Sequence, residues 1–254
     1  MNPNKAPNDT LAARLEQAIE LAQLSDHSVF ALGAEPSPPL RLPTLFAGKD
    51  APVVKHFNNP PSLRPAGFGL RHDGNSRIIR GELRQALVPG WKVLELWRDG
   101  MLIYAVDALV QPCWGSPRSD ETLRVNPLAL IEPIFLFAKL SSLIYHESPQ
   151  KPLSIAYQVS FRRLMNADKF AFLAEGPLDK LFFSNGHSHS ASQSDLDRAI
   201  VWPQGNVDPE AVAYQLVQEI YHWFGIEDPR IPYTKKNERD ESVIDPEQLV
   251  AAGK

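Results

Sequence analysis

Two histidines two residues apart, followed by two aspartates, are the best candidates for metal ligands in this chain. His187 and His189 lie in a Ser-rich stretch, and Asp195 and Asp197 follow them. Imidazoles at this spacing on an extended segment can both turn toward one ion, and a carboxylate can complete the ligand set. A solvated loop of this composition is more common. We therefore expect no cofactor, with zinc or manganese at His187, His189 and Asp195 as the alternative.

Five arginines fall in a short stretch that holds only two acidic residues. They are Arg64, Arg71, Arg77, Arg80 and Arg84. Guanidinium groups bind phosphates and carboxylates through paired hydrogen bonds, so this stretch predicts contact with an anion or a nucleic acid. The alternative is a solvated strand face that protects a sheet edge. The formal net charge of −4 provides no general attraction to nucleic acid.

Other catalytic patterns are weak. The sequence contains no Gly-x-Ser-x-Gly motif, no Gly-rich phosphate loop and no dinucleotide fingerprint. Asp73, Glu82 and Glu95 are expected on successive strands or turns, but Glu95 lacks the nearby lysine that a metal-dependent nuclease needs. We therefore predict a non-enzymatic sensing or interaction module. The alternatives are a metal-dependent hydrolase or nuclease that uses the histidine loop, and a nucleic-acid-binding adaptor that uses the arginines.

Two β-hairpins are expected in the middle of the chain. Asp73-Gly74 and Asp99-Gly100 predict their turns, so residues 66–72 should pair with 77–84 and residues 92–98 with 101–107. Leu70 is then expected to face Ile79. In the second hairpin the residues expected on one face are Leu94, Leu96, Ile103 and Ala105. Since both faces of this hairpin are apolar, it should lie at the centre of a sheet that is covered on both sides.

A long apolar helix and an alternating strand follow. Asn126-Pro127 predicts the start of a helix that ends near residue 146, and residues 153–161 alternate as a half-buried strand does. We predict one α+β domain over residues 1–226, with a mixed, mainly antiparallel sheet of about six to eight strands. The 126–146 helix should cover one face, and the N- and C-terminal helices the other face or the rim. From residue 227 the chain is polar, which predicts a loosely ordered tail.

The 126–146 helix is apolar nearly all round, so it needs cover on more than one side. An identical subunit related by two-fold symmetry is the predicted source of that cover. Phe135, Leu136 and Leu143 are expected nearest the interface. The alternative is that the Pro-rich segment 35–43 folds back over the helix.

The sequence predicts a cytoplasmic protein with no membrane contact. Residues 1–9 lack the apolar core of a signal peptide. The longest apolar stretch, residues 128–144, is interrupted by charged residues and is shorter than the roughly 20 apolar residues of a membrane span. Cys113 is the single cysteine, which excludes an intrachain disulfide, and it is expected to be buried and unreactive.

Part of the chain resembles a known group of proteins. The runs that carry the resemblance are Asn59-Pro-Pro-Ser-Leu-Arg-Pro-Ala-Gly-Phe-Gly-Leu, Leu96-Trp-Arg-Asp-Gly-Met-Leu-Ile-Tyr-Ala and Lys151-Pro-Leu-Ser-Ile-Ala-Tyr-Gln-Val-Ser. They resemble the region that follows the AlbA-type domain in Schlafen-like DNA-binding proteins of prokaryotes, over about residues 28–165. The resemblance implies an accessory, sensing part of a multi-protein system related to nucleic acids or defence. Because no AlbA-type domain is recognised before residue 28, it implies no catalytic residue.

Overall fold

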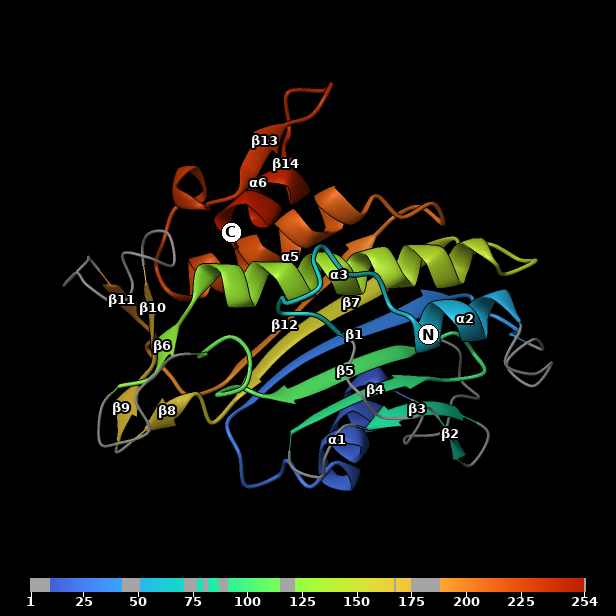
Figure 1. The fold of residues 1–254 in the computed structure, drawn as a ribbon, viewed down its shortest axis with the longest axis horizontal. Helices are drawn as coiled ribbons and strands as arrows, with labels where there is room; N and C mark the ends of the chain where they lie inside the picture. Colours follow the sequence, from blue (N-terminus) through green and yellow to red (C-terminus); the bar gives the residue numbers. More distant parts are fainter. Residues whose placement is uncertain are drawn as a thin grey trace.

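The computed structural model of the protein is an α+β fold around one seven-stranded antiparallel sheet (Figure 1), and the predicted fold class is confirmed. The structure describes residues 10–42, 51–70, 77–79, 82–86, 91–114, 122–166, 168–174 and 188–253. The strand order is β12-β7-β1-β5-β4-β3-β2. The strands are β1 (Val29–Ser37), β2 (Arg77–Ile79), β3 (Glu82–Ala86), β4 (Lys92–Leu96), β5 (Leu102–Asp107), β7 (Ser154–Arg162) and β12 (Leu196–Trp202).

The β4–β5 hairpin turns through three residues instead of the expected two. The last of them, Gly100, has φ +87°, which is the left-handed conformation that such a loop requires. The resulting register places Leu94 opposite Tyr104. Because a shift of one residue moves a side chain to the other face, Ile103 and Ala105 lie on the face away from Leu94. The predicted strands are therefore correct, and the predicted grouping of side chains is wrong.

The first predicted hairpin is also wrong. β2 pairs with β3, with Ile79 opposite Glu82, so residues 77–79 and 82–86 are two antiparallel strands and not the single strand that was expected over 77–84. The predicted turn at Asp73-Gly74 lies outside the described residues. Leu70, which was expected to face Ile79, is fully buried in the main core.

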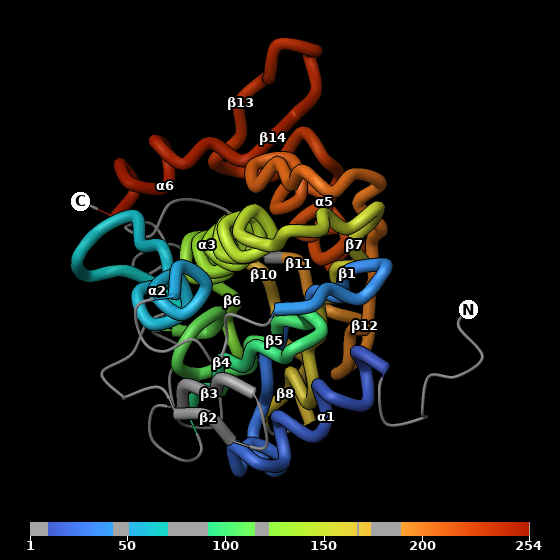
Figure 2. Tube along the Cα trace, turned by 90° about the vertical axis from the view of Figure 1, so that its right-hand side faces the viewer, coloured from blue at the N-terminus to red at the C-terminus, as the bar shows by residue number. Residues whose placement is uncertain are grey.

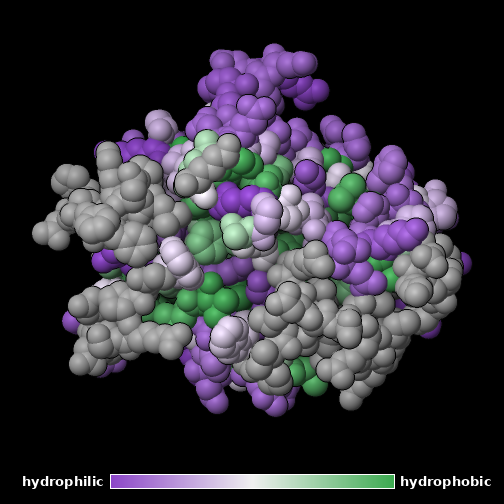
Figure 3. Space-filling view, viewed as in Figure 1, coloured by the Kyte–Doolittle hydropathy of each residue, from purple (hydrophilic) through white to green (hydrophobic). Residues whose placement is uncertain are grey.

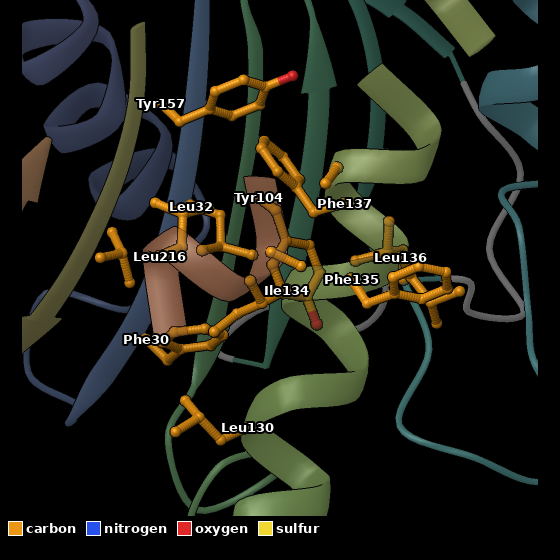
Figure 4. Close-up of a cluster of buried hydrophobic side chains, with 14 of the residues drawn as sticks. Phe30, Leu32, Tyr104, Leu130, Ile134, Phe135, Leu136, Phe137, Tyr157 and Leu216 are labelled. Carbon is orange, nitrogen blue, oxygen red and sulfur yellow. The ribbon is translucent and has the colours of Figure 1, made fainter. Parts of the chain in front are cut away.

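Helix α3 (Pro127–His146) packs on one face of the sheet and begins where the sequence predicts. Asn126 Oδ1 accepts hydrogen bonds from the backbone N–H groups of Leu128 and Ala129, at 2.9 and 3.3 Å. Figure 4 shows Ile134 of this helix beside Phe30 of β1, with further strand side chains around them. This contact is part of the main hydrophobic core. Among the described helices, α3 is the one apolar and long enough to cross a membrane, and most of it is buried inside the fold.

Three other helices cover the remaining sides of α3. They are α2 (Pro52–Asn58), α5 (Pro209–Trp223) and α6 (Pro246–Ala252). The C-terminal helix was expected on the opposite face or at the rim of the sheet. Figure 2 shows α5 beside α3 on the same face, where it packs on the edge strand β12 and its neighbour β7, so it does not cover the opposite face. The chain itself therefore provides the cover that a second subunit was expected to give.

Helix α1 (Leu11–Leu21) covers the second face of the sheet, as predicted for the N-terminal helix. It packs on β1, β4 and β5 and forms a separate core in which Leu15 and Ala18 meet Ala31 and Ile103. Thr10 caps the helix by accepting a hydrogen bond from the N–H of Ala13. β7 and β12 lie beyond the strands that α1 covers.

The prediction of a loosely ordered tail from residue 227 is wrong for the described part of that segment. It forms η3 (Asp228–Arg230), the hairpin of β13 (Thr234–Lys236) with β14 (Ser242–Ile244), and α6. Ile244 and Leu249 are fully buried against the main core. The polar composition belongs to the outer surface of this segment, which Figure 3 shows as hydrophilic at the top of the molecule.

Short strands complete the fold at one end. β6 (Arg124–Val125), β10 (Phe172–Ala174) and β11 (Ser188–Ser190) form a small sheet. β10 runs parallel to β6, so the described strands include one parallel pair, as the prediction of mixed pairing required. β8 (Met165–Asn166) and β9 (Lys169–Phe170) form a separate two-stranded hairpin.

Candidate functional site

The predicted metal ligands are not gathered in the described part of the chain. His189 lies in β11, opposite Leu173 of β10, and His187 falls outside the described residues. Asp195 holds a turn, because its carboxylate accepts hydrogen bonds from the backbone N–H of Arg163 at 3.1 Å and from the Ser194 hydroxyl at 2.5 Å. Across the described residues no three His, Cys, Asp or Glu side chains lie close enough to hold a metal ion.

The predicted arginine cluster is divided by the fold. Arg64 is 11% exposed and forms an ion pair with the buried Glu132, which directs its guanidinium away from the surface. Arg71 and Arg80 lie outside the described residues. Arg77 and Arg84 are paired in the backbone register of β2 and β3.

The predicted subunit interface on α3 is wrong for two of its three residues. Phe135 is 4% exposed and Leu136 is 0% exposed within the single chain, because α2, α5 and α6 contact this helix. Leu143 is half-buried. A partner cannot use side chains that the chain has already buried, so an interaction surface has to lie elsewhere.

The Arg64–Glu132 pair joins three elements beneath the C-terminal helix. Arg64 Nη2 lies 2.5 Å from Glu132 Oε2 of α3, and Arg64 Nη1 donates to the Leu249 carbonyl of α6 at 2.8 Å. The two side chains are 11% and 1% exposed. Burial raises the pKa of Glu132, while Arg64 and the backbone N–H of Phe68 act against that rise. These contacts hold the loop of residues 59–70 in place. They leave neither the guanidinium nor the carboxylate available for a reaction.

A second buried polar cluster holds the end of the same loop. Lys92 Nζ donates to the Gly69 carbonyl at 3.0 Å, and Gln111 Nε2 donates to the same oxygen at 2.9 Å. Gln111 also accepts a hydrogen bond from the Tyr104 hydroxyl. Desolvation lowers the pKa of Lys92 to about 8. Cys113 is fully buried nearby in the chain, and burial raises the pKa of its thiol, which disfavours a reactive thiolate.

The outer edge of the main sheet is the feature best suited to an interaction. β12 is the last strand in the order and pairs with β7 on one side over all of its seven residues. No strand in the described ranges pairs with its other side. Figure 2 shows β12 along one side of the molecule. An unpaired edge presents backbone N–H and C=O groups to which another extended chain can bind.

The charged side chains of β12 are held by partners in the same chain. Asp197 Oδ1 accepts hydrogen bonds from Gln158 Nε2 at 2.5 Å and from the Ser160 hydroxyl at 3.0 Å. Arg198 Nε lies 3.8 Å from Glu219 Oε2 of α5. Charges on an edge strand usually repel a second strand. Here both have partners in the same chain, but their side chains remain 48% and 51% exposed, so this protection is reduced and not removed.

Exposed apolar side chains accompany this edge. Val201 is 66% exposed and Leu153 is 77% exposed, which are the highest values among the large hydrophobic residues of the described chain. Val201 lies opposite Ala156 in the β12–β7 ladder, and Leu153 directly precedes β7. The two therefore lie at the same end of the sheet. We define the β12 edge as the outer side of Leu196–Trp202.

The importance of this strand is not evident from the sequence. Residues 196–202 form β12. A signal was present in the run Ala199-Ile200-Val201-Trp202, which is uncharged and lacks proline. The order of strands in the sheet decides whether such a run is an edge, and that order depends on pairings between residues far apart in the chain.

Comparison with known proteins adds no relative. No protein-family model, no curated protein and no solved structure matches the chain.

Proposed function

We propose that the protein is a sensing or interaction module whose β12 edge accepts an extended segment of a partner chain. The observation that carries this proposal is the long, continuous edge strand whose two charged side chains are engaged within the chain itself. Strand addition obtains its affinity from main-chain hydrogen bonds and its specificity from alternate side chains. On one face of the sheet, a partner strand would meet every second residue of β12. These residues are Asp197, Ala199 and Val201.

The state of the other reactive groups supports binding over catalysis. Arg64, Glu132 and Lys92 are engaged in buried contacts that fix a loop, and Tyr157 shares a hydrogen bond with Ser141 inside the core. Such groups can stabilise a scaffold that presents a binding edge. A role as one component of a multi-protein system is also what the resemblance of residues 28–165 to Schlafen-like proteins implies.

Site-specific photo-crosslinking in the cells that produce the protein tests the proposal. A photoreactive phenylalanine analogue at Ala199, which is exposed on β12, should give a light-dependent covalent adduct. The same analogue at Glu20, which is exposed on α1, is the matched control and should give none. Peptide mass analysis of the adduct then identifies the chain that was bound. Absence of an adduct at Ala199, or equal adducts at both positions, would overturn the proposal.

A further inference from the structure

We propose that the partner strand at the β12 edge is β12 of a second copy, in an antiparallel pair centred on Ile200. This inference rests on the proposed function, because it names the partner of the same edge. A two-fold axis through an antiparallel strand pair joins identical surfaces, so the strand has to be complementary to itself. Two neighbouring registers of such a pair are centred on Ile200 and on Ala199. The residues of β12 are more complementary to themselves in the register centred on Ile200.

In the register centred on Ile200, the apolar positions meet one another. Ala199 lies opposite Val201 of the partner subunit, and Arg198 lies opposite the partner subunit's Trp202. Val201 is 66% exposed in the single chain, so this pairing removes it from water. Cross-strand pairs between apolar side chains are favourable. The neighbouring register, centred on Ala199, would instead place Asp197 opposite the exposed Val201.

The charges of the strand do not oppose this register. The one charged residue inside the paired segment is Arg198, and no arginine of the second copy lies opposite it. Asp197 lies just outside the segment and is held by Gln158 and Ser160. Like charges directly opposite one another destabilise a strand pair, and this arrangement avoids them.

The helices that cover the sheet also permit the pairing. α5 packs over β7 and β12 of its own chain, and neighbouring strands are about 4.8 Å apart. Two copies of α5 over adjoining strand pairs would then lie about 10 Å apart, which is an ordinary distance between packed helices. Five paired residues on each side form a small interface, so we expect a reversible dimer and not an obligate one.

Disulfide trapping distinguishes this register from others. Ala199→Cys and Val201→Cys are made separately, then oxidised alone and as an equimolar mixture. Position 199 lies opposite position 201 of the second copy, whereas two copies of the same position are diagonal and about 7–8 Å apart. The mixture should therefore form a covalent dimer readily and each single variant poorly. Cys113 is fully buried and should contribute little to the products.

Sedimentation of the unmodified full chain supplies the independent measurement. It should show a monomer–dimer equilibrium that Val201→Lys weakens at least about tenfold, because a lysine on an edge strand is a natural barrier to pairing. Since Val201 is exposed, the variant should retain the circular dichroism spectrum and melting temperature of the parent. A chain that stays monomeric at the highest concentration, or single variants that crosslink as well as the mixture, would overturn the inference.

The outcomes separate this inference from the proposed function. A monomeric chain whose Ala199 photo-adduct contains a different protein leaves the edge as a binding site and overturns the second copy as its partner. A monomeric chain with no adduct at Ala199 overturns both.

Discussion

Replacing Arg64 with methionine is expected to destabilise the protein by about 3–5 kcal/mol at neutral pH. The substitution leaves Glu132 without its cation, although this carboxylate is 1% exposed and faces the apolar layer around α3. It also removes the donor to the Leu249 carbonyl of α6. A buried carboxylate that keeps the Phe68 N–H but loses its cation is costly because most of the lost hydration is no longer offset. Urea unfolding followed by circular dichroism measures the loss.

The effect of Arg64→Met should depend on pH. Burial raises the pKa of Glu132 and Arg64 opposes that rise, so the variant should have a still higher pKa at this carboxyl. The folded variant then binds a proton more readily than its unfolded chain, and its stability should increase as the pH is lowered toward the unfolded pKa of a glutamate. The deficit relative to the parent is therefore expected to be largest above neutral pH.

Arg162→Met is the matched control for this prediction. Arg162 also pairs with a glutamate at 2.8 Å, but Glu16 is 56% exposed. An exposed pair contributes at most about 1 kcal/mol. Equal losses in the two variants, or a deficit of Arg64→Met that grows on acidification, would contradict the account of the buried pair.

The second large effect is expected to be a gain in stability. Lys92→Met should stabilise the protein by about 2 kcal/mol at pH 7, since it removes a buried ammonium group and keeps a side chain of similar length. Lys92 is 7% exposed, and its pKa is lowered to about 8 by desolvation. The Gly69 carbonyl that it bonds keeps its hydrogen bond from Gln111. Thermal unfolding of the two proteins at equal ionic strength provides the comparison.

The gain from Lys92→Met should disappear at high pH. Between a folded pKa of about 8 and an unfolded value of about 10.4, the unfolded parent binds more protons than the folded parent. The stability of the parent therefore rises through this interval relative to the variant. Lys235→Met is the control, because Lys235 is 39% exposed and pairs with Glu210; it should cause a change of at most about 1 kcal/mol. A Lys92→Met variant that is less stable than the parent at pH 7 would contradict the prediction.

Local signals in the sequence predicted the elements well. Asn126 and Pro127 identify the start of α3 because an asparagine cap and a first-turn proline satisfy helix geometry without distant contacts. The alternation of residues 153–161 identifies β7 for a similar reason. The β4–β5 hairpin was predicted in place but shifted by one residue, since both two- and three-residue loops accept Asp-Gly.

Long-range pairing could not be predicted in this way. Arg64 was interpreted as a surface contact for anions, yet it forms an ion pair with the buried Glu132 across 68 positions of the chain. The same limit applies to the tail, where Ile244 and Leu249 are buried although charged residues surround them in the sequence. For the same reason the sequence does not reveal that β12 is an edge strand. Whether a strand lies at an edge depends on the order of the strands in the sheet.

Amide hydrogen exchange of β12 at low and high protein concentration tests most directly whether this edge pairs with another chain. We predict that residues 196–202 exchange more slowly as the concentration rises, while the interior strand β1 stays protected throughout. Val201→Lys should remove this dependence on concentration. Exchange of residues 196–202 that is the same at all concentrations, or slowing that appears in another segment instead, would contradict the account.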